Sequence, residues 1–120
     1  MISIVDVALI TMVMAVATVS SKADEGTYRG FLVIAPEVEV FEPCGSDEPL
    51  WLDYTPELRK VLFERYEELR TQPYEETYVE LRGVPGPQLD CAFCEEYSGS
   101  FKVEAVVEQR ARQPTDCHDA

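Results

Sequence analysis

The sequence predicts a small, mainly β domain, with five strands and one α-helix between the third and the fourth strand. Short segments that alternate between apolar and polar residues predict the strands, and a stretch with helical spacing before Pro73 predicts the helix. The chain has 120 residues, which is enough for one domain and too few for two domains with separate cores. We therefore expect a single domain over residues 24–120.

The first half of this domain predicts three strands. The mostly apolar residues 28–35 indicate a buried strand, after which Pro36 turns the chain. Residues 37–40 alternate with period two, which is typical of a strand with one face in solvent. Residues 43–49 are rich in Gly, Ser and Asp and predict a loop, and residues 50–52 follow as a short third strand.

The next segment changes to helical spacing. Thr55 is suited to cap a helix, and Pro56 and Glu57 are suited to its first turn. The apolar residues that recur on one helical face are Leu58, Val61, Leu62, Tyr66 and Leu69. Because a proline disfavours helical backbone in the residue before it, we expect the helix to span Pro56 to Arg70 and to end before Pro73.

Two more strands follow the predicted helix. Residues 76–82 alternate and place Val79 and Leu81 toward the core, whereas residues 83–98 predict a long irregular segment. Residues 101–108 alternate again, with apolar side chains at Phe101, Val103, Ala105 and Val107. Three strands, a helix and two strands is the element order of the OB barrel, so we expect a small OB-type β-barrel whose helix plugs one open end.

An apolar leader precedes the predicted domain. Residues 7–19 carry no charge, and this length suits a secretory signal better than a membrane span, which needs about twenty residues. Ser21 and Ala23 supply the small residues of a cleavage site. We therefore expect residues 1–23 to be a signal peptide and the mature protein to be periplasmic or secreted, without a membrane span. Asp6 stands where signals carry a basic residue, so an uncleaved anchor and an ordinary core segment are the alternatives.

The charge of the chain constrains its partners. Asp and Glu number 23 against 10 Lys and Arg, which gives a formal net charge of −13. This charge repels the phosphates of nucleic acids, so we expect no nucleic-acid ligand. It attracts cationic partners, and the plainer alternative is that it only keeps an exported protein soluble.

Four cysteines predict two disulfides in a short exported chain, with three alternative pairings. They are Cys44, Cys91, Cys94 and Cys117. In the chain-entropy account of disulfides, a bridge from Cys44 to Cys117 would stabilise the domain by roughly 4 kcal/mol, against roughly 2 kcal/mol for a ring of Cys91 and Cys94. The long bridge, if it forms, is therefore the stabilising one.

The Cys91-x-x-Cys94 pair also permits two functional interpretations. A thioredoxin-like redox site would need a helix N-terminus and a βαβ unit, and the two glutamates after Cys94 would disfavour a thiolate. Together with Cys117 and His118 the pair has the ligand types of a zinc or copper site, which competes with a disulfide at Cys117. We favour a structural clip on a long loop and expect no cofactor.

The sequence gives no indication of catalysis. His118 is the only histidine and stands two residues from the chain end, so a Ser-His-Asp or Cys-His arrangement would have to be built on a terminal tail. Adjacent acidic pairs such as Glu67 and Glu68 are expected by chance in so acidic a chain, whereas a glycosidase needs two carboxylates across a cleft. We therefore expect a protein that is not an enzyme.

Four aromatic residues form a candidate binding surface. They are Trp51, Tyr54, Tyr74 and Tyr78. OB domains use aromatic side chains to stack on bases or sugars, although packing within the fold would explain these residues equally well. With nucleic acids excluded by the charge, saccharides, other small ligands and proteins remain as candidate partners.

Several motifs, taken together, resemble those of a known family. They are Phe41-Glu42-Pro43-Cys44-Gly45, Trp51, an amphipathic helix that ends near Tyr66 and Leu69, Tyr78-Val79-Glu80-Leu81-Arg82-Gly83, and Cys117. With this set, residues 26–117 resemble the C-terminal OB domain of the NlpE family, envelope lipoproteins of Gram-negative bacteria linked to surface-stress and copper signalling. The resemblance implies that Cys44 pairs with Cys117, which leaves Cys91 and Cys94 to each other.

Two features of that family are missing from this chain. No cysteine for lipid attachment follows Ala23, and there is no separate N-terminal barrel with its own Cys-x-x-Cys. The resemblance therefore implies the fold, and not the anchoring, the copper delivery or the stress signalling. We expect an exported, non-catalytic envelope domain that binds or senses a ligand or a protein partner. The alternatives are an acidic inhibitor or antagonist of a cationic enzyme, and a zinc- or copper-binding protein that uses the cysteines and His118.

Overall fold

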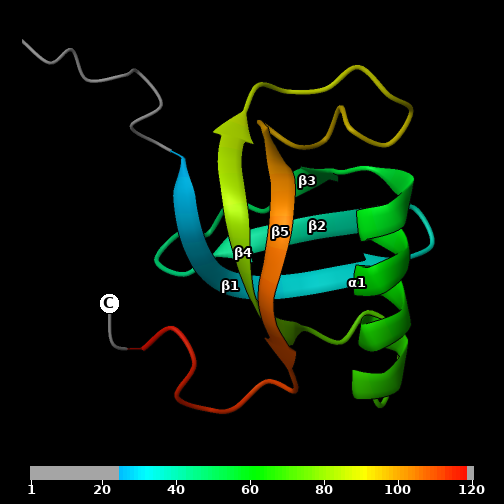
Figure 1. The fold of residues 1–120 in the computed structure, drawn as a ribbon. Coiled ribbons are helices and arrows are strands. Elements are labelled where there is room, and N and C mark those ends of the chain that lie inside the picture. The colour runs from blue at the N-terminus through cyan, green and yellow to red at the C-terminus, as the bar shows by residue number, and fades with distance from the viewer. Residues whose placement is uncertain (1–24, 119–120) are drawn as a thin grey trace, which may run out of the picture.

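The computed structural model describes residues 25–118, so the leader predicted over residues 1–23 lies outside the described part of the chain. The elements are β1 (Gly26–Ala35), β2 (Val38–Pro43), β3 (Leu50–Asp53), α1 (Pro56–Leu69), β4 (Thr77–Gly86) and β5 (Ser100–Arg110) (Figure 1). The protein is mainly β, and the predicted order of three strands, one helix and two strands is confirmed. Within residues 25–118, no helix combines the length and the hydrophobicity that crossing a bilayer requires.

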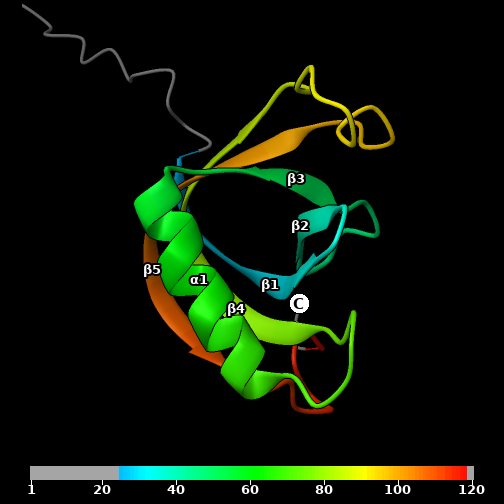
Figure 2. The ribbon, with the colours of Figure 1, turned by 90° about the vertical axis from the view of Figure 1, so that its right-hand side faces the viewer.

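All five strands belong to one sheet with the order β1-β2-β3-β5-β4, and the pairing of β4 with β1 closes it. The pairing of β3 with β5 is parallel, and the other pairings are antiparallel. In Figure 1, β4 and β5 cross in front of β1 and β2. β3 pairs with β5 only over Trp51–Asp53, and α1 packs beside β5 and β1 (Figure 2).

The core fills the space between α1 and the strands. Its fully or nearly fully buried members are Leu32, Ile34, Phe41, Leu52, Leu62, Tyr66, Val79, Leu81, Phe101 and Val103. The Phe101 ring makes edge contacts with Phe41 and Tyr28, at centroid distances of 4.9 and 5.2 Å. Each large side chain of this set stabilises the fold by about 1.5–3 kcal/mol relative to exposure, so the alternating residues decide which face of each strand turns inward.

Gly30 lies where β1 has partners on both edges. It pairs with Pro43 of β2 on one side and with Val79 of β4 on the other. A Cβ at this position would overlap the carbonyl oxygen of Glu42 and the ring of Phe41. The glycine that interrupts the apolar run of the first strand is therefore required by the close approach of β2.

Two apolar residues that the sequence places on the core side are instead exposed. On β5, Val107 is 52% exposed because the pairing with β4 shifts between Glu80 and Leu81, which oppose Glu108 and Val106. Val107 has no partner in this bulge, so the alternation reverses and Val106 packs against the core. The prediction for Val107 is therefore wrong.

On α1, Val61 is 53% exposed, whereas Phe63 packs against the core. These two residues lie at opposite edges of the buried stripe, each about 100° around the helix from Leu62. The turn between β1 and β2 lies on the Phe63 side, where a groove joins the two elements. The sequence pattern alone does not distinguish the two edges. β4 is also longer than predicted, since it runs through Pro85 to Gly86.

Candidate functional site

A groove of about 390 Å³ lies between the turn from β1 to β2, one flank of α1 and the loop that follows α1. Its apolar lining consists of Ile34, Ala35, Pro36, Phe63 and Pro73. Its polar lining consists of Glu37, Glu39, Arg59, Glu67, Arg70 and Tyr74. Pockets of this size that combine an apolar surface with a few polar groups are typical of ligand sites.

The helix contributes one face to the groove. Arg59, Phe63, Glu67 and Arg70 are spaced by four, four and three residues, which places them on the same side of α1. The start of the helix, and with it this alignment, is set by Thr55, whose Oγ1 accepts a hydrogen bond from the N–H of Leu58 at 3.2 Å. The cap at Thr55 thus fixes where α1 begins, and the packing of α1 on β5 and β1 turns this side toward the groove.

Glu39 accepts three hydrogen bonds at the edge of the groove. Its carboxylate accepts hydrogen bonds from Nε and Nη2 of Arg59, both at 3.1 Å, and from the hydroxyl of Tyr54 at 2.6 Å. Partial burial opposes ionisation of Glu39, but these hydrogen bonds outweigh it, and the pKa of Glu39 lies below its usual value. Partial burial and the contact with Glu39 raise the pKa of Tyr54. The group is therefore a neutral tyrosine beside a closed ion pair at physiological pH.

The loop after α1 provides the exposed aromatic ring of the groove. Tyr74 is 53% exposed, and its hydroxyl donates to the carbonyl oxygen of Pro36 at 3.4 Å. At the C-cap of α1, Arg70 makes two hydrogen bonds to Glu67, both at 2.9 Å, which lower the pKa of the Glu67 carboxyl. The groove thus has an accessible ring and two arginines that are already paired.

The structure places the four aromatic residues of the predicted binding surface in three different regions. Tyr74 lines the groove, and Tyr54 supports it through Glu39. Trp51 of β3 packs beside Tyr97 of the loop before β5, with ring centroids 5.5 Å apart. Tyr78 of β4 is only 5% exposed and lies under the guanidinium of Arg110, 3.9 Å from its ring centroid.

All four cysteines are in disulfides, Cys44 with Cys117 and Cys91 with Cys94. This pairing is the one that the resemblance implies. The segment with Cys91 and Cys94 lies at one end of the sheet and the C-terminal segment at the opposite end (Figures 1 and 2). His118 is exposed beside Cys117. In the part of the chain that the structure describes, no cluster of three or more His, Cys, Asp or Glu could hold a metal ion.

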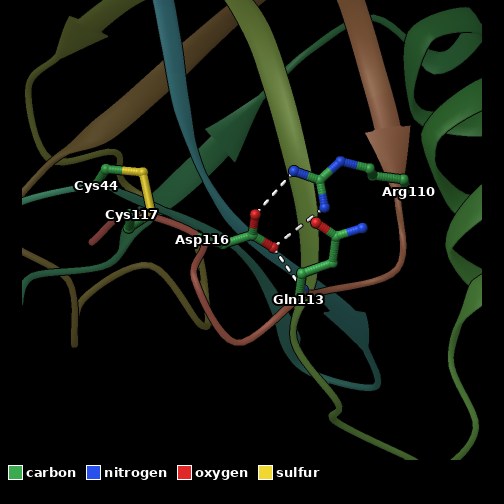
Figure 3. Close-up of a disulfide and its surroundings, with 5 residues drawn as sticks. All are labelled: Cys44, Arg110, Gln113, Asp116 and Cys117. Atoms are coloured by element: carbon green, nitrogen blue, oxygen red, sulfur yellow. Dashed lines mark hydrogen bonds and ion pairs between the residues drawn. A yellow bond between two sulfur atoms is a disulfide. The ribbon is translucent and has the colours of Figure 1, made fainter. Parts of the chain in front are cut away.

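A second polar cluster fastens the C-terminal segment next to the long disulfide (Figure 3). The Asp116 carboxylate accepts hydrogen bonds from Nη2 and Nη1 of Arg110 at 2.8 and 3.2 Å, and from the N–H of Gln113 at 2.6 Å. These contacts, above all those with Arg110, lower the pKa of Asp116. Nearby, Arg112 pairs with Glu76 and lies over the ring of Phe31. The cluster holds the C-terminal segment against the end of β5 and acts as a structural contact.

Sequence reasoning did not identify the groove. Of its lining residues only Tyr74 was a candidate, while Glu37, Glu39, Arg59 and Phe63 were not. The one local signal was a proline in each loop, Pro36 before Glu37 and Pro73 before Tyr74, because proline is common in turns. No protein-family model, curated protein or solved structure is significantly similar to the chain. Any function therefore has to be inferred from the chemistry of the groove.

Proposed function

We propose that this protein is an exported, non-catalytic domain of the bacterial envelope that binds a ligand or a protein partner in the groove between the β1–β2 turn and α1. On this proposal the closed sheet is an OB-type barrel like the C-terminal domain of the NlpE family, and residues 1–23 are a cleaved signal. The element order supports the fold assignment. Two disulfides support an oxidising compartment, which includes the periplasm and the exterior of the cell.

The observation that carries this proposal is the groove itself. It has a volume of about 390 Å³ and places the exposed ring of Tyr74 beside an apolar lining and a charged rim. A concave apolar surface with a few polar groups is the usual form of a binding site for a small ligand or a side chain of a partner. The groove is also formed by elements far apart in the chain, so its shape depends on the complete fold.

Two of the three carboxylates that line the groove, those of Glu39 and Glu67, favour binding over catalysis. A general acid or base at neutral pH needs a pKa near the working pH. The pKa values of Glu39 and Glu67 are instead lowered by hydrogen bonds from Arg59 and Arg70. Both carboxylates are therefore charged and already accept hydrogen bonds from an arginine, which suits the lining of a binding site.

Indole is a neutral aromatic probe that tests the proposed site. In NMR titrations of the protein we expect indole to shift the backbone amides of Ala35, Phe63 and Tyr74, and we expect the variant Tyr74→Ser to lose most of the shift. Tyr97→Ser is the matched control, because it removes an aromatic ring beside Trp51, outside the groove. Shifts that centre on Trp51, or that persist in Tyr74→Ser, would contradict the assignment of the site.

A further inference from the structure

The turn between β1 and β2 carries an unfavourable residue. Ala35 pairs with Val38, so the turn has two central residues, Pro36 and Glu37. Proline holds the first φ near −65°, and the φ of Glu37 is 65°, which are the signs of a type II turn. This turn favours glycine at its second central position, because a side chain in the left-handed region crowds the backbone. Glu37 thus bears a side chain at a position where glycine would be more stable.

The loop after α1 repeats this arrangement. The N–H of Glu75 donates to the carbonyl oxygen of Gln72 at 3.4 Å across the central residues Pro73 and Tyr74. The φ of Tyr74 is 64°, so a bulky ring also stands where a type II turn favours glycine. More than half of the Tyr74 surface is exposed, so burial of the ring compensates only part of this strain.

The two strained residues border the same groove. Glu37 and Tyr74 both line it, and the hydroxyl of Tyr74 donates to the carbonyl oxygen of Pro36, which joins one turn to the other. Within residues 25–118 the only other non-glycine residue with positive φ is Cys117, which a disulfide holds. Residues kept in such backbone conformations cluster at ligand sites. The position of Glu37 and Tyr74 at the groove therefore indicates a role in contacting a ligand.

The unpaired charge that these two turns contribute to the groove is negative. Glu39 pairs with Arg59, and Glu67 pairs with Arg70. Glu37 is exposed and, within the described part of the chain, is the one charged residue of the groove lining without an ion pair. The exposed face of an aromatic ring also attracts cations. Glu37 and Tyr74 therefore favour the same kind of ligand group.

We propose that the groove binds a basic side chain of a protein partner, with Glu37 and Tyr74 contacting its guanidinium or ammonium group. An apolar residue next to that side chain would then pack on Ala35 and Phe63. The net charge of −13 attracts a cationic macromolecule at long range and favours a protein partner over a small cation with a single charge. This inference rests on the proposed function, since it names the ligand class of the same groove.

A synthetic peptide tests the inference directly. The probe is acetyl-Gly-Arg-Phe-Arg-Phe-Gly-amide, and its control carries citrulline in place of both arginines, which keeps the shape and removes the charge. In NMR titrations of the purified protein we expect the arginine peptide to shift the amides of Glu37, Phe63 and Tyr74. We expect the citrulline peptide to bind about tenfold more weakly, as expected for a loss of about 1.4 kcal/mol.

Two charge-matched variants locate the contact. Glu37→Gln keeps the size of the side chain. It should raise the Kd for the arginine peptide about fivefold, without changing the affinity for the citrulline peptide. Glu64→Gln removes the same charge from an exposed position of α1 that does not line the groove, and it should leave the Kd nearly unchanged. Tyr74→Leu keeps an apolar side chain without the ring and should also weaken binding of the arginine peptide. Spectra of the free variants verify that each remains folded.

The remaining outcomes separate this inference from the proposed function. Equal affinity for the arginine and citrulline peptides would overturn the inference and leave the groove as a binding site. Equal weakening by Glu37→Gln and Glu64→Gln would also overturn it, because the net charge alone would then explain the binding. Benzamidine binding as tightly as the peptide would show that the ligand is a small organic cation. If neither indole nor the peptide shifts the groove amides, the proposed function fails as well.

Discussion

Arg110 and Asp116 form an ion pair through both carboxylate oxygens, with one arginine nitrogen 2.8 Å from Oδ1 and the other 3.2 Å from Oδ2 (Figure 3). The pair joins the end of β5 to the segment that carries Cys117, and the guanidinium of Arg110 also covers the ring of Tyr78. The C-terminal segment is therefore attached to the sheet at a second point, one residue before the disulfide.

This ion pair predicts how stability depends on pH. The hydrogen bonds from Arg110 keep the pKa of Asp116 in the folded state below the value of about 3.9 expected in an unfolded chain. The stabilisation is therefore complete above about pH 4 and is lost as the pH falls through the folded-state pKa. Urea unfolding at pH 7 and pH 3 should show a smaller loss of stability in Asp116→Asn than in the wild type. Equal losses in the two proteins would contradict a coupling through Asp116.

The two disulfides should differ in their contribution to stability. Cys44 and Cys117 are 73 residues apart, whereas Cys91 and Cys94 are three apart. Replacing Cys44 and Cys117 by serine should lower the free energy of unfolding by about 2–5 kcal/mol, and the same change at Cys91 and Cys94 by roughly 2 kcal/mol or less. Urea unfolding measures both effects. Peptide mapping of the unreduced protein checks the pairing, and a peptide that joins Cys44 to Cys91 or Cys94 would contradict it.

Replacing the strained turn residue should stabilise the protein. Glu37→Gly relieves a positive φ of 65°, and we expect a gain of about 0.5–1 kcal/mol after the larger entropy of glycine in the unfolded chain is included. Glu64→Gly makes the same change within α1 and should destabilise the protein by about 1 kcal/mol. Thermal unfolding of both variants shows whether each substitution raises or lowers the stability. A loss of stability in Glu37→Gly would mean that its side chain supports the fold.

Neighbouring residues of α1 should respond very differently to the same charge. Leu62 is fully buried, so Leu62→Asp places an unpaired carboxylate in the core and should destabilise the fold by about 3 kcal/mol or more. Val61 is 53% exposed, so Val61→Asp should change stability by less than about 1 kcal/mol. The comparison uses the melting temperature, and similar values for the two variants would show that the buried face of α1 is assigned wrongly.

Local patterns predicted the element order because each depends on neighbouring residues. The cap at Thr55 and the spacing of Leu62 and Tyr66 were sufficient to predict α1. Val107 could not be placed in the same way, because its exposure depends on a bulge created by pairing with β4. The difference between Val61 and Phe63 likewise depends on which side of the helix the β1–β2 turn covers.

The groove was beyond local reasoning for a related reason. Pro36 and Pro73 each predict a turn, but neither indicates that the following residue has a positive φ or that the two turns meet. Their side chains are brought together by the pairing of β1 with β4 and by the packing of α1. The cysteine spacing similarly left three pairings open, and only the resemblance selected one of them.

The closure of the sheet limits the ways in which this protein can associate with others. Each strand has a neighbour on both sides, but β3 pairs with β5 only over Ser100–Lys102, and α1 packs beside β5 where no strand does. Recruitment of a strand from another chain, which begins edge-to-edge aggregation and also drives peptide recognition by strand addition, would have to displace α1 from this edge of β5. The helix therefore protects the longest unpaired edge of the sheet against strand addition for as long as the fold is intact.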